Sequence, residues 1–104
     1  MAMKDIPNTE KNIARALTLD PDSTWNNFFM GRFYDELKGD NTQALIYYKK
    51  ADQLAGGSYT EAQTRIGEIY LRTGQTSAAR SLASELSRRD PNNASVQSFV
   101  AKVK

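Results

Sequence analysis

The chain has 104 residues, of which 39% are hydrophobic and 25% are charged, as expected for a single globular domain. Its 14 basic and 12 acidic side chains give a net charge of +2, a balance that argues against nucleic acid or an acidic membrane as the partner. Cysteine and histidine are both absent, which excludes disulfides, zinc sites built on these residues, thiol nucleophiles and histidine-dependent triads, and leaves no cysteine pattern from which to infer a compartment.

Helical periodicity predicts about six helices, which in chain order are residues 8–20, 23–38, 41–55, 59–73, 76–89 and 94–104. The first of them resembles the second helix of a hairpin whose first helix is missing. The next four form two hairpins, and Gly39 and Gly74 end the first helix of each one. The last helix places Val96, Phe99 and Val103 on one face, which is typical of a terminal capping helix.

Polar residues that can cap helices precede three of these segments. Asp40 with Gln43 and Ser58 with Glu61 have the spacing of a capping box, in which side chains satisfy free backbone donors of the first turn. In the segment 90–93, a proline ends one helix and an asparagine is placed to cap the next. We therefore expect helices to begin after Asp40, Ser58 and Asn93.

A sequence pattern recurs at a spacing of about 35 residues. The segments 30–39 and 66–74 both contain an apolar residue, a glycine, a polar residue, an apolar residue and a tyrosine, followed by a closing glycine. The closing glycines are 35 residues apart, whereas Gly31 and Gly67 are 36 apart, so the first copy has one extra residue, which we place in the turn. Pro21 and Pro91 are separated by two such periods. The chain therefore contains an internal repeat.

These residues resemble the tetratricopeptide repeat family, and the resemblance covers the chain from about Asn8 to its C-terminus. The matching positions are Met30, Gly31, Tyr34, Ala44, Tyr48 and Ala51 in one repeat and Ile66, Gly67, Tyr70, Gly74, Ala79, Leu86 and Pro91 in the next. The chain departs from the motif where it has Asn27 and Gln63 in place of the first Trp, and Ala83 in place of a usual aromatic.

The resemblance implies an all-α, right-handed superhelix (an α-solenoid) formed by one domain. Its parts would be a partial repeat helix at 8–20, repeats at 23–57 and 58–91, and a capping helix at 93–104. Since a glycine opposite an alanine lets two helices approach closely, we expect Gly31 to face Ala44 and Gly67 to face Ala79.

The resemblance also implies that ligands bind along the concave side, on the first helix of each hairpin. On these positions the predicted anchors are Trp25, Phe28 and Arg32, and the predicted polar contacts are Thr64, Glu68 and Lys102. Charged residues there are also explained as solvated helix faces with weak ion pairs. Trp25 and Phe28 are explained equally well as packing against the N-terminal helix.

Other site chemistries are poorly supported by the sequence. Tyr34, Tyr48 and Tyr70 occupy core positions of the motif, which favours packing over nucleobase stacking. The carboxylates at 35–36 and at 61 and 68 lie on open helices, which seldom form the cleft that an acid–base pair needs. No apolar run is long enough to cross a membrane. We therefore predict no enzyme activity, no cofactor, no metal site and no direct membrane insertion.

The predicted function is protein–protein interaction, as an adaptor, scaffold or assembly factor that holds a peptide or a partner helix in a concave groove. The alternative is a structural unit that dimerises or oligomerises through its incomplete end helices. The apolar residues Ile6, Ile13, Ala16 and Leu17 of the first helix favour this alternative, because they need cover.

Overall fold

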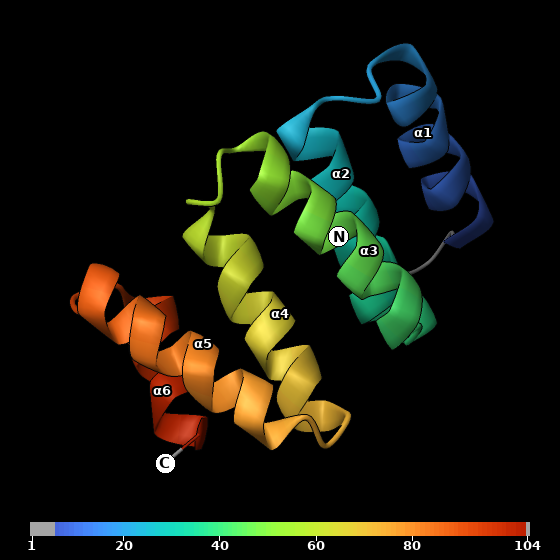
Figure 1. The fold of residues 1–104 in the computed structure, drawn as a ribbon. Coiled ribbons are helices and arrows are strands. Elements are labelled where there is room, and N and C mark those ends of the chain that lie inside the picture. Colours follow the sequence, from blue (N-terminus) through green and yellow to red (C-terminus); the bar gives the residue numbers. More distant parts are fainter. Residues whose placement is uncertain (1–5, 104) are drawn as a thin grey trace. The chain divides into compact units, whose positions relative to one another are not determined.

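The computed structural model describes the backbone of residues 6–103 and the side chains of residues 8–103. In this part of the chain every regular element is a helix, short turns join the helices, and there is no strand (Figure 1). It divides into two compact units at the junction between Ser58 and Tyr59, here called unit 1 and unit 2. The prediction of an all-α helical repeat is confirmed. The superhelical course through both units stays a prediction.

Unit 1 contains α1 (Ile6–Leu19), α2 (Thr24–Arg32), a π-helix η1 (Phe33–Lys38) and α3 (Asn41–Leu54). Helices α2 and α3 pack against each other, and α1 packs against α2. The ring of Tyr48 is fully buried, lies 5.6 Å from the ring of Phe28, and its hydroxyl donates a hydrogen bond to Asp35 Oδ2 at 3.0 Å. The core of unit 1 therefore lies mainly between α2 and α3.

The π-helix corrects the prediction that the extra residue of the first repeat lies in the turn. Helix α2 continues directly into η1, and Gly39 ends the element with a φ of +66° and an N–H that donates to the carbonyl of Tyr34. A π-helical turn holds one residue more than an α-helical turn over the same length. The insertion is therefore absorbed inside the helix, and a glycine with positive φ follows it, as Gly74 does in unit 2.

Unit 2 contains α4 (Thr60–Arg72), α5 (Thr76–Arg89) and α6 (Ala94–Val103). Helix α4 packs against both α5 and α6, which also pack against each other (Figure 1). A cluster of buried apolar residues, here called the unit 2 core, consists of Ala79, Ala83, Leu86, Val96 and Phe99. Tyr70 and Leu71 of α4 pack against this core.

The predicted helix starts are right at two positions and wrong at one. Asp40 Oδ1 accepts a hydrogen bond from the Gln43 N–H, and Asn93 Oδ1 accepts one from the Val96 N–H, both at 3.1 Å. Ser58 does not cap α4, since its hydroxyl donates to the carbonyl of Ala55 at 3.0 Å. The helix begins one residue later, with Tyr59 as N-cap and no side-chain cap bond, so the spacing of a capping box is lost.

The atoms nearest to each of the two repeat glycines belong to an aromatic ring, and the predicted pairing of these glycines with Ala44 and Ala79 stays a prediction. A Cβ added at Gly31 would lie 2.6 Å from Cδ1 of Tyr48, and one added at Gly67 would meet the ring of Phe99. Both glycines therefore serve close packing, as expected, but the atoms that fill the space belong to bulky side chains. Ala44 and Ala79 are themselves fully buried.

Candidate functional site

Helix α2 presents an exposed pair of aromatic side chains. Trp25 is 61% exposed and Phe29 is 37% exposed, and their rings stack with centroids 5.0 Å apart and planes 14° apart. Phe28 contacts Trp25 edge-on, with ring centroids 6.3 Å apart. Since Trp25 is this exposed, α1 does not fold over it. The stacked pair, here called the α2 aromatic pair, is an apolar feature open to solvent.

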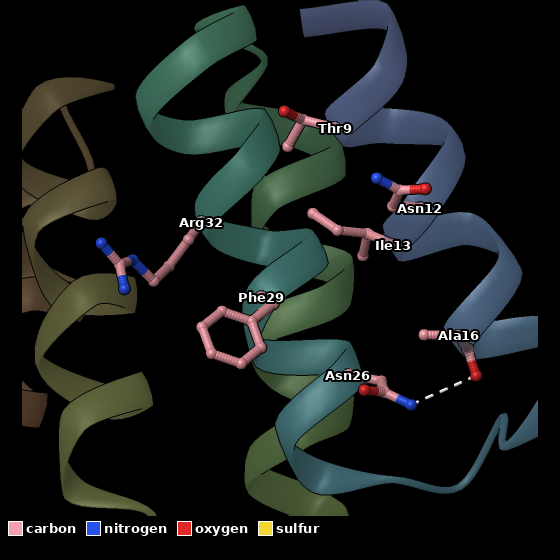
Figure 2. Close-up of a pocket in the computed structure, with 7 residues that line it drawn as sticks. All are labelled: Thr9, Asn12, Ile13, Ala16, Asn26, Phe29 and Arg32. Carbon is pink, nitrogen blue, oxygen red and sulfur yellow. Dashed lines mark hydrogen bonds between the residues drawn. The ribbon is translucent and has the colours of Figure 1, made fainter. Parts of the chain in front are cut away.

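A pocket of about 290 Å³ lies between α1 and α2, next to Phe29 (Figure 2). Ile13 points from α1 towards α2, and the Asn26 side chain donates a hydrogen bond to the carbonyl of Ala16 at 3.2 Å, which ties the two helices together. The complete lining consists of Thr9, Asn12, Ile13, Ala16, Asn26, Phe29 and Arg32. This pocket, here called the α1–α2 groove, is mostly apolar with polar groups at its edges.

Arg32 is the charged residue in the lining of the α1–α2 groove, and two of its guanidinium nitrogens donate to the Glu36 carboxylate. Its Nε donates a hydrogen bond to Glu36 Oε2 at 2.8 Å, one turn further along the helix. A guanidinium carries five N–H donors, so this pairing leaves donors for a second acceptor. The groove therefore combines an apolar floor with one arginine at its end.

Unit 2 has a pocket of different chemistry, about 350 Å³ in volume, between α4 and α6. Ser95 donates a hydrogen bond to Glu61 Oε2 at 3.2 Å, and Arg65 lies 3.4 Å from the other oxygen of the same carboxylate. The lining consists of Glu61, Thr64, Arg65, Glu68, Ala94, Ser95 and Ser98. This surface is polar, and its charges are already paired within the unit.

The structure separates the predicted anchors into buried and exposed residues. Trp25 is exposed, but Phe28 is only 4% exposed and packs against Tyr48. Phe28 is therefore packed in the core rather than open to a partner, and the ring of Tyr48 beside it belongs to α3 and not to the N-terminal helix named in the alternative. The reason is that α3 covers this side of α2, a pairing that helical periodicity alone does not resolve.

The predicted polar contacts all belong to unit 2, where two of them bind each other. Lys102 Nζ donates to Glu68 Oε1 at 2.7 Å, joining α6 to α4. Thr64 is 4% exposed, and its hydroxyl donates to the carbonyl of Glu61 within the same helix at 2.9 Å. Thr64 is thus corrected from an open contact to a buried residue of a pocket wall, because its hydroxyl is satisfied by its own backbone.

Three residues of unit 1 were missed by the sequence reasoning: Ile13 as a groove residue, Asn26 and Phe29. Phe29 carried a usable signal, because it precedes Phe99 by two repeat periods, the same spacing that relates Pro21 to Pro91. Motif positions directed attention to Phe28 instead, one residue away. A shift of one residue turns a helical side chain by about 100°, which is enough to move it from the core to the surface.

Two tyrosines have perturbed acidity, one in each unit. Burial raises the pKa of the Tyr34 hydroxyl above its ordinary value, and the carboxylate of Glu10 on α1 raises it further. Burial also raises the pKa of Tyr59, and Glu61 adds to the shift while Arg65 opposes it. Neither hydroxyl lines a pocket described above, so these shifts concern stability rather than the chemistry of a site.

Nothing in the described residues forms a metal site, since they contain no cluster of three or more carboxylate, histidine or cysteine side chains with suitable geometry. Within the same residues, no helix has the length and hydropathy needed to cross a membrane.

Comparison with known sequences agrees with the helical architecture. The family model described as "Tetratricopeptide repeat" matches residues 37–103, well over half of the chain. No curated protein was found to match the sequence.

Proposed function

The chain belongs to the tetratricopeptide repeat family, whose members commonly mediate protein–protein interaction and are generally non-catalytic, and we propose that it binds another protein through the α2 aromatic pair. In this proposal it acts as an adaptor, scaffold or assembly factor. The observation that supports it most directly is that Trp25, although stacked on Phe29, is 61% exposed.

An exposed tryptophan held in place by a second ring is well suited to binding. Tryptophan is enriched among the residues that contribute most to interface affinity, because it buries a large area while losing little conformational freedom. The stack already restricts the indole before a partner arrives, which lowers the entropic cost of association. Phe28 supports this surface from beneath, and Arg32 adds a charged anchor on the same helix.

Glu68 and Lys102 are proposed as secondary polar contacts on unit 2, whereas Thr64 is buried and is not among them. Glu68 and Lys102 are half-exposed and bind each other, so a partner would have to share or replace this ion pair. Exposed ion pairs contribute little stability, on the order of 0–1 kcal/mol, so the exchange is inexpensive. Their proposed role is selectivity rather than most of the affinity.

Self-assembly is the second candidate function. Besides the α2 aromatic pair, unit 1 exposes 78% of Leu19 at the end of α1, and large exposed apolar surface often marks an interface. Light scattering over a range of protein concentrations tests this candidate: a monomer at high concentration removes it, and a concentration-dependent dimer supports it.

Capture of partners from the native host tests the principal proposal. We expect Trp25→Ala to lose proteins that the unmodified chain retains, while melting temperature and helical circular dichroism stay unchanged because the side chain is mostly exposed. The matched control is Ile46→Ala on α3, which removes another exposed apolar side chain, 53% exposed, and should leave capture intact. Equal capture by both variants, or unfolding of Trp25→Ala, would contradict the proposal.

A further inference from the structure

The first two helices of unit 1 repeat the last two helices of unit 2 at a fixed spacing. Helix α1 begins and ends 70 residues before α5, and α2 begins 70 residues before α6. The connecting segments correspond too, since Asp20-Pro21 and Asp90-Pro91 are 70 residues apart. The pair α1–α2 is therefore the structural counterpart of the pair α5–α6.

In unit 2 this pair is covered by a third helix. Helix α4 packs against both α5 and α6, and the residues between them form the buried unit 2 core. Gly67 of α4 rests on the ring of Phe99, so closely that a Cβ there would collide with it. In unit 1, no described helix precedes α1, so the structure describes no counterpart of α4.

The lining of the α1–α2 groove corresponds residue by residue to the surface that α4 covers. Thr9, Ile13, Ala16, Asn26 and Phe29 each lie 70 residues before a member of the unit 2 core, in the order Ala79, Ala83, Leu86, Val96 and Phe99. The other two lining residues are Asn12, whose counterpart Leu82 packs against that core, and Arg32, whose counterpart Lys102 bonds Glu68 of α4. The groove thus has the location and the polarity of a surface built to be covered by a helix.

We propose that the α1–α2 groove receives an amphipathic helix of a partner protein, which lies on α1 and α2 as α4 lies on α5 and α6. This inference rests on the proposed function of protein binding and names the class of partner. The partner helix takes the place on α1 and α2 that α4 has on α5 and α6, and its apolar face becomes continuous with the core of unit 1.

The contacts of α4 specify the chemistry of the partner helix. A glycine or another small residue must lie over Phe29, as Gly67 lies over Phe99. An acidic residue follows it directly and reaches Arg32, as Glu68 reaches Lys102. Opposite charge at this point fixes the register of the helix, because Arg32 is the lining residue that carries a charge.

At its beginning the partner helix must differ from α4. In unit 2, Glu61 accepts a hydrogen bond from Ser95 and Gln63 accepts one from Arg89. The residues of unit 1 that lie 70 positions before Ser95 and Arg89 are Trp25 and Leu19, and both are apolar and exposed. A partner helix with apolar residues in place of the glutamate and the glutamine would cover them, and this joins the α2 aromatic pair to the groove in one binding surface.

In a second copy of the chain, α4 is the described helix in which a glycine is followed directly by an acidic residue. Among the described helices, glycine occurs only in α2 and α4. In α2 the residue after Gly31 is Arg32, which would repel the groove arginine of the other copy, whereas in α4 the sequence Gly67-Glu68 fits but already covers α5 and α6. We therefore assign the occupant to a partner protein, and a second copy of the chain is the competing outcome of the test below.

A synthetic peptide tests the inference directly. The peptide carries residues 59–73 of this chain with Glu61→Leu and Gln63→Leu, and it contains no tryptophan. Trp25 is the only tryptophan of the protein, so its fluorescence reports binding at the groove itself. We expect a saturable shift of the emission to shorter wavelength, because the docked helix buries the indole.

Charge reversal distinguishes the groove from the corresponding surface of unit 2. The peptide with Glu68→Lys should bind the unmodified chain about tenfold more weakly, and Arg32→Glu should restore its binding. The matched control is Lys102→Glu, which changes the counterpart of Arg32 and should leave peptide binding unchanged.

A peptide with Gly67→Leu should not bind, because its side chain collides with Phe29. The variant Ile13→Lys should also abolish binding, whereas Ile46→Lys should not.

Several results would overturn the inference. These are the absence of any fluorescence shift, binding that responds to Lys102→Glu and not to Arg32→Glu, and a dimer of the chain that excludes the peptide. If the peptide fails while Trp25→Ala still loses captured proteins, the inference falls and the proposed function stands. If the peptide binds but capture does not depend on Trp25, the helix-binding groove stands and the function proposed for the α2 aromatic pair falls.

Discussion

Phe29 and Phe99 occupy the same place in two related helix pairs, yet one is 37% exposed and the other is fully buried. Phe99 is covered by α4, whose Gly67 lies against its ring, whereas Phe29 faces the open α1–α2 groove. The comparison of unit 1 with unit 2 shows that the repeat register defines which side chains are able to form a core. The presence of a covering helix then decides whether they do.

The glycines show a second difference between the units. Gly31 lies against Tyr48 of α3, the partner helix in its own hairpin. In unit 2 the residue 35 positions after Tyr48 is Ala83, which is too small to fill the same space. Phe99 fills it from α6 instead, so the loss of the motif aromatic at Ala83 is compensated by the next helix along the chain.

The largest expected effect tests the first comparison. Phe99→Ala should lower the free energy of unfolding by about 3–5 kcal/mol, because it removes a buried ring and leaves a cavity. Phe29→Ala should cost less than about 1 kcal/mol, because its ring is partly exposed and no helix covers it. Denaturant unfolding followed by circular dichroism measures both, and equal losses would show that Phe29 is as well packed as Phe99.

An intermediate effect is expected at the two glycines. Gly31→Ala and Gly67→Ala should each destabilise the protein by up to about 2 kcal/mol, since overpacking costs up to about 3 kcal/mol and improved helix propensity returns about 1 kcal/mol. Thermal unfolding measures the change.

Because Gly31 and Gly67 lie against different rings, a second substitution should restore stability in one of the two alanine variants and not in the other. Phe99→Leu should recover part of the loss in Gly67→Ala but not in Gly31→Ala, because only Gly67 lies against Phe99. Recovery in both variants would mean that the glycines share one packing partner.

The smallest effect is expected from pH. Because the pKa values of Tyr34 and Tyr59 are raised above 10.0, the folded state holds these phenolic protons more tightly than the unfolded chain does. Their contribution to stability is complete below pH 10.0 and is lost as the pH rises through the raised values. Tyr34→Phe and Tyr59→Phe should each reduce this alkaline loss, measured as melting temperature against pH, and an unchanged slope in both variants would contradict the shifts.

Most of the fold was predictable from local signals. The glycines at 39 and 74 ended their helices, and Asp40 and Asn93 capped the next ones, because these signals act through neighbouring backbone groups. The π-helix and the displaced start of α4 were not predictable in the same way. Both depend on how one residue is accommodated between packing partners that lie far along the chain, which a local pattern does not reveal.

The candidate site was predictable only in part. Trp25 and Arg32 were identified from motif positions and are exposed or half-buried on α2, whereas Phe28 was also identified and is buried. Phe29 was missed, although its spacing from Phe99 pointed to it. The roles of Trp25 and Arg32 in binding a partner stay predictions, and the binding experiments above test each of them separately.

The sequence by itself determined the helices, their order and the register that relates α1–α2 to α5–α6, because periodicity, caps and glycine punctuation are properties of short segments. Only the tertiary structure decided which of the equivalent positions are core and which are surface. Burial is a property of neighbours: Phe99 is buried because α4 lies on it, and Phe29 is open because the described chain places no helix there.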